Sequence, residues 1–456
     1  MSAFIVARIV GPAEVGVGAA VVAVHVLLWV VINALFADAL VQRATLDDSE
    51  ASSAVWASTL VGVLGAAVQV AVAVPVANSI GDPRIVTMSL VLAIPLPLVG
   101  AGGAMQGLLT RNREYRVLAG RAMIGQGGGT LVGVAMAFAG FGAWAIVAQQ
   151  LVTSMVGALS LVLRTSFRPS LSLRWTPVRE LLRVGFPLVL NTLVQHSRYR
   201  LFALLIGGTA GAAALGHVHM AFRLVDTVRE LVSTALWRLS LPTMSERQAD
   251  LPALRAAVAR FLDLSALVLF PTFGAMLVVI DPLVRLLLGR VWAPSSDASA
   301  LLIVITMYNF LYFPAGVALV ARGNTRFTLI ASTVMTALTL LGVTIIRPTT
   351  PMEAVWVWSV AQMLVYPVMQ YGTARLLGDN MFSQMRAGMP ALILTVAATA
   401  AAFLVPRALG QPDDPLLLMV SRLAVGAMVY LPAALFLLRA SVVAALRSVG
   451  MRRHPA

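Results

Sequence analysis

The sequence predicts an all-α integral membrane protein with about fourteen transmembrane helices. Composition is the first indication: of 456 residues, 59% are hydrophobic and 11% are charged, and the mean hydropathy is +0.89. Soluble domains carry roughly 25% charged residues. The second indication is a row of apolar segments, and the third is the uneven distribution of arginine between them. Together these features predict a chain that crosses a bilayer many times.

Most of the apolar segments are long enough to cross a bilayer. A transmembrane helix needs about 20 residues. The first is the exception, because its helix would be only about 15 Å long. It has neither the basic start nor the cleavage site of a signal peptide. Either the first span is short or the true start lies upstream of Met1, and we favour the second. The segments lie at 1–10, 15–37, 54–78, 85–109, 122–139, 143–163, 184–206, 215–237, 261–280, 298–320, 327–346, 352–373, 388–405 and 416–438.

Arginine marks alternate joints between these segments. The chain has no lysine, and 22 of its 33 basic residues lie in every second joint from 38–53 onward or in the C-terminal tail. Cytoplasmic joints of multi-pass proteins are enriched in arginine and lysine. The alternation therefore predicts that these joints and the C-terminus are cytoplasmic. The opposite joints hold only Arg84, Arg285, Arg290, Arg347 and Arg407.

A weak internal repeat divides the chain. Gly11 and Gly16 precede one long span, and Gly211 and Gly216 precede another at a constant offset. Six spans separate the copies, so both halves have the same orientation, as in parallel transporter repeats. Glycine pairs could also recur by chance in a chain with 35 glycines. We predict an N-terminal lobe of six spans at 1–163, a cytoplasmic linker at 164–183, a C-terminal lobe of six spans at 184–373, two further spans at 388–438 and a basic cytoplasmic tail at 439–456.

Several classes of function are disfavoured by what the chain lacks. It has no cysteine and only five histidines, with no His-x3-His pair, so we expect no disulfide, no metal site and no cofactor. The net charge of +14 lies mainly at span ends, which favours membrane lipids over nucleic acid as partners. Every outward joint is short, which argues against an enzyme. The longest joints, 164–183 and 238–260, could each hold an interfacial helix, and Leu251–Arg260 has a suitable composition.

One face of the predicted span 215–237 is polar along its whole length. At 100° per residue, six of its residues fall within about 80°. Charged groups inside a bilayer face a bundle interior or a wet cavity. Alternatively, Arg223 pairs with Asp226 and Glu230 and only holds helices together, whereas Arg229 lies off this face and should pair locally. The six residues are His219, Arg223, Asp226, Glu230, Ser233 and Trp237.

The preceding span carries a second, narrower polar face. Asn191, Gln195 and Arg198 are separated by four and three residues, and Arg200 points to the opposite side. A short glycine-rich turn joins the two spans, so we expect them to be adjacent and antiparallel, and Arg198 and Arg223 could then face one cavity. Guanidinium groups bind phosphate in a bidentate manner. We predict a substrate site formed by Arg198, Arg223, Gln195, Asn191 and His219, with Asp226 and Glu230 as coupling or ion-pair groups.

A run of glycines in the span 122–139 resembles the sequence of a phosphate-binding loop. No strand precedes it, and the spacing Gly125-x3-Gly129-x3-Gly133 is typical of small-residue helix packing in membranes. We therefore interpret these glycines as a helix contact. Arg422 is isolated in the last predicted span, and we assign it no role at this stage.

Several short motifs resemble those of bacterial polysaccharide flippases. Arg8–Gly16 resembles the joint that follows their first span, and Gly140–Ala145 resembles their fifth joint. Val15 and His217 depart from the family pattern, which has aromatic residues there. The order and spacing of the motifs agree over nearly the whole chain. The further matches are Arg183–Pro187 with Ile206–Gly208 and Ala214–Gly216, Leu241–Pro242 with Arg247–Gln248, and Gly289–Trp292.

The resemblance implies the oligosaccharide-flippase branch of the MOP superfamily, which is related to lipid II flippases and to MATE-type exporters. Such proteins have two six-helix lobes around a central cationic cavity. They move undecaprenyl-diphosphate-linked glycans from the cytoplasmic to the outer leaflet of the bacterial inner membrane by alternating access. The implied partners are the lipid-linked oligosaccharide, membrane lipids and other glycan-assembly proteins.

Three alternatives stay open. A MATE-like drug or metabolite antiporter would need an acidic, cation-binding cavity, whereas the intramembrane charges here are mainly basic. A membrane-embedded glycosyltransferase or ligase would need an acid-base pair beside a loop, and none is evident. A non-transporting scaffold of glycan assembly would have the same spans. We expect a transporter and not an enzyme.

Overall fold

The computed structural model describes residues 2–410 and 412–437, apart from the side chains at positions 191, 195, 325, 383 and 384. Within this described part all regular structure is helical, as predicted. Eleven stretches in it are long and apolar enough to cross a membrane, so the chain is a multi-pass membrane protein. The number fourteen stays a prediction, and the predicted basic tail at 439–456 lies outside the described residues.

The chain forms two compact units. The first comprises Met1–His219 with Val343–Thr350, and the second comprises Met220–Gly342 with Pro351–Ala456. The first unit holds α1 (Ser2–Val10), α2 (Pro12–Ala34), α3 (Ala37–Gln42), α4 (Asp48–Ile80), α5 (Arg84–Ala93), α6 (Leu96–Arg111), α7 (Tyr115–Phe138), α8 (Ala143–Arg164) and the first part of α9 (Trp175–Ser245).

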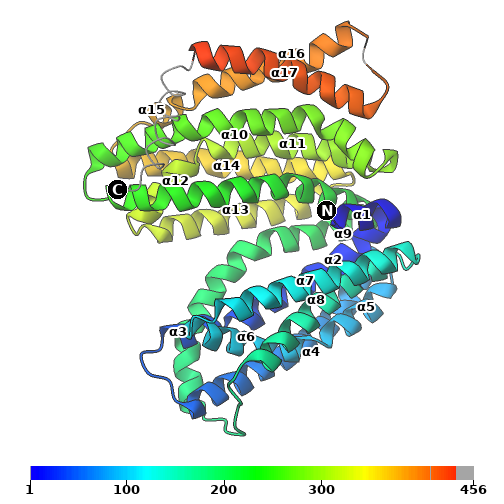
Figure 1. Ribbon diagram of the computed structural model, residues 1–456, viewed down its shortest axis with the longest axis vertical. Coiled ribbons are helices and arrows are strands. Elements are labelled where there is room, and N and C mark those ends of the chain that lie inside the picture. Colours follow the sequence, from blue (N-terminus) through cyan, green and yellow to red (C-terminus); the bar gives the residue numbers. More distant parts are fainter. Residues whose placement is uncertain (1, 411, 438–456) are drawn as a thin grey trace. The chain divides into compact units, whose positions relative to one another are not determined.

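The remaining helices belong mainly to the second unit, and a short 3₁₀ turn (Arg290–Trp292) lies among them. Helices α16 and α17 lie side by side, next to α10 (Figure 1). The helices are α10 (Leu251–Leu287), α11 (Ala293–Phe310), α12 (Phe313–Ala321), α13 (Thr325–Ile346), α14 (Pro351–Leu377), α15 (Met381–Arg386), α16 (Met389–Ala408) and α17 (Pro415–Leu437).

Some predicted spans are divided or weakened. The span at 85–109 is built from α5 and α6, which break where Pro95 cannot donate a backbone hydrogen bond. The span at 298–320 is likewise built from α11 and α12, with Pro314 in the first turn of α12. Helix α7 is not among the eleven apolar stretches, because its glycines, Arg121 and Gln126 lower its hydropathy.

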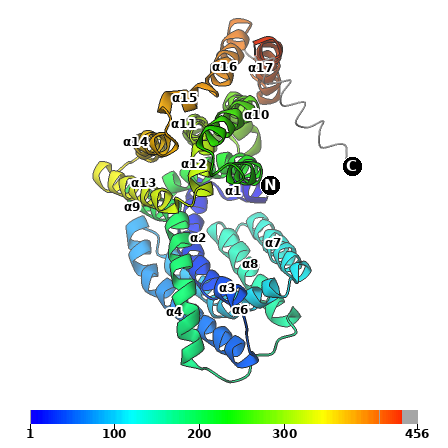
Figure 2. The same cartoon turned by 90° about the vertical axis from the view of Figure 1, so that its left-hand side faces the viewer.

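The glycine run of α7 is a helix contact, as predicted. Helices α7 and α8 lie side by side in both views (Figure 1; Figure 2). A Cβ atom on Gly129 would lie 2.6 Å from the carbonyl oxygen of Gln149 and would overlap the hydroxyl of Thr153. One on Gly133 would lie 2.8 Å from the Gln149 Cβ. Any larger residue would force the two helices apart, so close packing explains these glycines.

The two copies of the glycine repeat share one backbone geometry. Gly11 has φ 83° and ψ 170°, and Gly211 has φ 82° and ψ 173°, a conformation that glycine adopts without strain. A Cβ on Gly16 would overlap the carbonyl of Ala212, and one on Gly216 would overlap the carbonyl of Pro12. Within the first unit the two turns therefore pack on each other reciprocally.

The cytoplasmic joint expected at 238–260 is much shorter in the structure. Helix α9 continues to Ser245 and α10 begins at Leu251, so the predicted separate interfacial helix at Leu251–Arg260 is wrong. The start of α10 is fixed by Asp250, whose Oδ1 accepts from the Ala253 backbone N–H at 3.1 Å, and by Pro252 in the first turn. Leu251–Arg260 is therefore the first part of a long helix.

Candidate functional site

Helix α9 carries all the predicted site residues. Asn191 and Gln195 are helical, but their side chains lie outside the described residues. Arg198 follows in the same helix, and its Nε and Nη2 atoms are buried. A charged residue within a membrane span is costly, which makes Arg198 a candidate for a functional role.

His219 lies beyond the turn at Gly211 and contacts the helix arm before it. Its Nδ1 and the hydroxyl of Tyr199 are 3.0 Å apart, and the two rings are 6.3 Å apart between centroids. This hydrogen bond connects positions on either side of the reversal, as expected for two adjacent antiparallel arms. Tyr199 was not predicted as a site residue, because it lies off the face of Asn191, Gln195 and Arg198.

The charged face of α9 is on the accessible side of the helix in the second unit. Arg223 and Glu230 are exposed, whereas the neighbouring apolar residues Leu224 and Val225 are buried. The predicted polar face is therefore accessible.

Asp226 pairs with Arg229 and not with Arg223. The Arg229 Nε donates to the Asp226 Oδ1 at 2.8 Å, a spacing of three residues that brings side chains together on a helix. The local pairing expected for Arg229 is confirmed. The alternative in which Asp226 pairs with Arg223 is wrong, because the carboxylate is taken up by the nearer partner. Arg198 belongs to the first unit and Arg223 to the second, so their shared cavity stays a prediction.

A cluster of tyrosines and amides in the second unit was not predicted. Tyr312 donates to the hydroxyl of Tyr308 at 2.7 Å and stacks on Tyr366, with ring centroids 5.3 Å apart. Beside it the Asn309 amide donates to the Gln362 Oε1 at 2.7 Å. The spacing of Tyr308, Asn309 and Tyr312 could have indicated this cluster, since residues three or four apart share a helix face. Since Tyr312 and Gln362 are buried, these contacts hold α11, α12 and α14 together.

An ion-pair network at the predicted outward side of the first unit was also missed. Arg84 donates from Nη2 to the Glu14 Oε1 at 2.8 Å and to the Asp82 Oδ2 at 2.7 Å. Glu14 in turn accepts from the Ala143 backbone N–H at 2.6 Å, so its charge lies at the N-terminus of α8. The hydrogen bonds from Arg84 hold the pKa of Asp82 below its ordinary value of 3.8. This network joins the starts of α2, α5 and α8.

No metal centre is evident in the described part of the chain, where no group of three or more His, Asp or Glu side chains could hold an ion. The residues on α9 instead offer guanidinium groups, an imidazole and carboxylates. Guanidinium groups suit the recognition of a phosphorylated substrate.

The chain resembles known proteins of polysaccharide biosynthesis. The family model described as "Polysaccharide biosynthesis protein" matches residues 5–297. The succinoglycan biosynthesis transport protein ExoT of Rhizobium meliloti is 24% identical over 289 residues, which are 63% of this chain. The match spans 58% of the length of ExoT. The teichuronic acid biosynthesis protein TuaB of Bacillus subtilis is 21% identical over 386 residues, 83% of this chain and 79% of TuaB.

Two solved structures share the fold. The lipid II flippase MurJ in an inward closed conformation superposes with a TM-score of 0.80 at 12% sequence identity, over 97% of each chain. An inward-facing multidrug resistance MATE transporter of the MOP superfamily superposes with a TM-score of 0.64 at 16% identity, over 83% of this chain and 93% of that one. Both neighbours are transporters, as ExoT is by name.

Proposed function

Because the chain belongs to the polysaccharide biosynthesis protein family, we propose that it flips a lipid-linked oligosaccharide across a bacterial inner membrane. The substrate is an undecaprenyl-diphosphate glycan, which moves from the cytoplasmic to the outer leaflet by alternating access. The chain is a membrane transporter of polysaccharide biosynthesis and not an enzyme. Its C-terminus is cytoplasmic, and its partners are membrane lipids and other glycan-assembly proteins.

The buried guanidinium of Arg198 carries this proposal. An arginine in an apolar helix is costly, and two of its nitrogens are buried. A diphosphate brings two negative groups that accept charge-assisted hydrogen bonds from guanidinium groups. Arg198 and the exposed Arg223 attract the diphosphate, while Asn191, Gln195 and His219 bind the adjoining polar groups.

The acidic residues of the site have a second role. Asp226 is held by Arg229 at 2.8 Å, so its charge is already balanced within its own helix. Glu230 is exposed one turn further along. We assign both to ion coupling or ion pairing. A cation that replaced Arg229 as the partner of Asp226 would change the charge of the accessible face.

The test is translocation in reconstituted vesicles. A fluorescent undecaprenyl-diphosphate oligosaccharide is incorporated, and the fraction open to an impermeant quencher is followed over time. Arg198→Ala and Arg223→Ala are compared with wild type and with Arg179→Ala, an exposed arginine near the start of the same helix. A charged hydrogen bond contributes about 1.5–3 kcal/mol, so each site variant should reduce the rate about tenfold or more.

Intact folding of each variant is checked by its unfolding temperature and its elution as a single species. Transport that falls in Arg198→Ala and Arg223→Ala but not in Arg179→Ala supports the diphosphate site. Equal transport in all four proteins would refute it and leave the two site arginines as structural residues. Wild-type vesicles that transport a cationic drug and not the lipid would support a MATE-like antiporter instead.

A further inference from the structure

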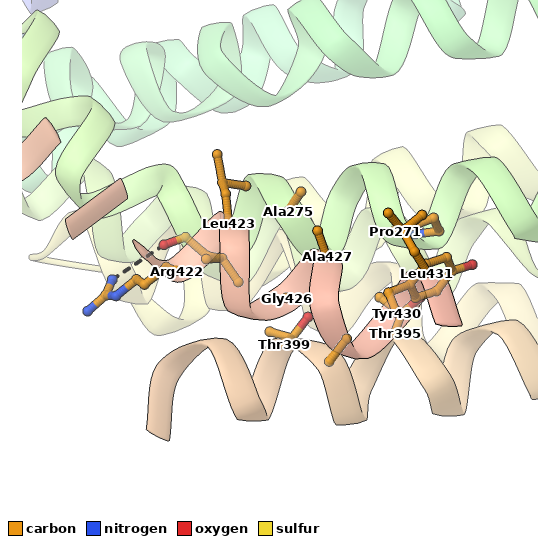
Figure 3. A pocket seen from close by; sticks show the side chains of 13 residues that line it. Pro271, Ala275, Thr395, Thr399, Arg422, Leu423, Gly426, Ala427, Tyr430 and Leu431 are labelled. Atoms are coloured by element: carbon orange, nitrogen blue, oxygen red, sulfur yellow. Dashed lines mark hydrogen bonds between the residues drawn. The ribbon is translucent and has the colours of Figure 1, made fainter. Parts of the chain in front are cut away.

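A groove of about 190 Å³ runs along α10, α16 and α17, away from the polar face of α9 (Figure 3). Its floor and walls are small or apolar, and include Gly274, Ala275, Gly426 and Ala427. Small residues on facing helices leave the space between them open. A polar contact between α17 and α10 lies at each end, one at Tyr430 and one at Arg422.

The end near Tyr430 is closed by a bond to a carbonyl that proline has freed. Pro271 has no backbone N–H, so the Leu267 carbonyl four residues earlier loses its helical partner. The hydroxyl of Tyr430 donates to that carbonyl at 3.3 Å. Within a membrane an unsatisfied carbonyl is costly, so α17 supplies a donor that α10 lacks.

The end near Arg422 repeats this arrangement. Pro282 frees the Val278 carbonyl in α10, and the Nη1 of Arg422 donates to it at 3.3 Å. Arg422 is only 4% exposed, and its guanidinium lies 4.9 Å from the ring centroid of Phe403. The guanidinium thus keeps its charge among apolar neighbours and bonds across to α10. A positive charge therefore stands at one end of an apolar groove.

Further arginines surround this end of the groove. The charges of Arg285, Arg407 and Asp281 all act on Arg422. Asp281 accepts from the Arg285 Nε at 3.0 Å, and both Arg285 and Arg407 are exposed. Three arginines and one aspartate leave a net charge of two positive, which matches an anionic headgroup.

The groove is also open on the side where α17 is exposed. Only 11% of the most apolar window of α17 is buried, and Leu423 and Leu431 on the groove rim are 37% and 60% exposed. An apolar helix with so little burial faces lipid in a membrane. Arg422 lies seven residues after Pro415, about 10 Å along α17, so its charge is near the end of the helix and not at its middle.

We propose that this groove binds one anionic phospholipid of the outer leaflet, separate from the transported substrate. The phosphate lies against the exposed Arg407 and Arg285, near the buried charge of Arg422, and one acyl chain fills the groove between Arg422 and Tyr430. The leaflet follows from the predicted topology, which places the start of α17 on the outward side. The bound lipid completes the packing between α10, α16 and α17.

The test is native mass spectrometry of the purified full-length protein with added phosphatidylglycerol or phosphatidylcholine. Wild type should retain one phosphatidylglycerol with at least fivefold preference over phosphatidylcholine. Ala427→Leu fills the groove, and Ala397→Leu is the matched control at an exposed α16 position outside it. Arg407→Gln removes one surface charge and leaves Arg422 and its bond to α10 in place.

Retention lost in Ala427→Leu, kept in Ala397→Leu and weakened at least threefold in Arg407→Gln supports the proposal. Equal retention of both phospholipids would show an apolar groove without headgroup recognition and would overturn it. A polyprenyl phosphate that displaces phosphatidylglycerol, and is itself lost in Ala427→Leu, would make this a substrate site and also overturn it. Absence of any retained lipid would also overturn the proposal. Transport is measured separately, so failure here leaves the proposed flippase activity untouched.

Discussion

Single residues far apart in the sequence stabilise the predicted outward side of the first unit. Arg84 bonds to Asp82 nearby and to Glu14, which lies 70 residues away. Glu14 in addition accepts from the first backbone N–H of α8, where the helix dipole favours a negative charge. One arginine thus connects three helix starts. The arrangement is partly exposed, so each bond contributes less than a buried one would.

This network predicts a pH-dependent contribution to stability. The pKa of Asp82 is lowered from its ordinary value of 3.8, chiefly by the hydrogen bonds from Arg84. The stabilisation is therefore complete above about pH 4 and is lost as the pH falls through the lowered pKa. Asp82→Asn should cost about 1 kcal/mol at pH 7 and almost nothing near pH 2.

The measurement is the unfolding temperature of wild type and Asp82→Asn in detergent between pH 7 and pH 2. Asp297→Asn, an exposed aspartate at the start of α11, serves as the control. A difference between wild type and Asp82→Asn that stays constant over this range would contradict the linkage to Arg84.

Residue contacts of this kind could not be predicted from the sequence. Arg84 was recognisable only as one of five arginines in the outward joints, and no periodicity connects it with Glu14. His219 was predicted because its helix face is polar, whereas its partner Tyr199 lies among charged neighbours on another face. Helical periodicity identifies a face, but it does not identify the partner opposite that face.

At the scale of elements, apolar runs predicted where the helices lie better than where they end. The joint after α9 was expected to be long because it contains many polar residues. Arginine, leucine and glutamine are good helix formers, so both neighbouring helices extend into it. Asp250 and Pro252 are recognisable start signals for α10, and they were overlooked because the composition resembled an interfacial helix. The α7 glycine contact was predicted correctly because its spacing of four has a direct steric meaning.

The attachment of α17 to α10 gives an element-scale prediction. The Tyr430 hydroxyl serves a carbonyl that is free only because residue 271 is proline. Tyr430→Phe should therefore destabilise the protein by about 1 kcal/mol. In the Pro271→Ala protein, the backbone N–H of residue 271 can bond to the Leu267 carbonyl. Tyr430→Phe should therefore cost much less in that protein than in wild type.

A double-mutant cycle measures this coupling as the difference between the two Tyr430→Phe effects on the free energy of unfolding in a detergent titration. Thr399→Ala, on the α16 side of the same groove, is the control that does not touch the Leu267 carbonyl. Additive effects of Tyr430→Phe and Pro271→Ala would refute the assignment of the hydroxyl to the proline-freed carbonyl.

At the scale of the whole molecule, the arginine distribution is the strongest sequence signal, and it concerns orientation. The repeat glycines were recognisable as pairs, but their reciprocal packing was not, because spacing along the chain carries no information on contact. The polar face of α9 was predicted as one site, although its residues divide between two compact units at His219 and Met220. Orientation can be tested directly because the chain contains no cysteine.

Single cysteines introduced on opposite sides give the last prediction. Ser166 lies in an arginine-rich joint and Asp413 in a joint before α17, and both are exposed. The positive-inside rule counts arginine and lysine and gives acidic residues little weight, so Asp413→Cys should leave the topology unchanged. In spheroplasts of a bacterial host, an impermeant maleimide should label Asp413→Cys at once and Ser166→Cys only after permeabilisation. The reverse pattern would place the arginine-rich joints outside.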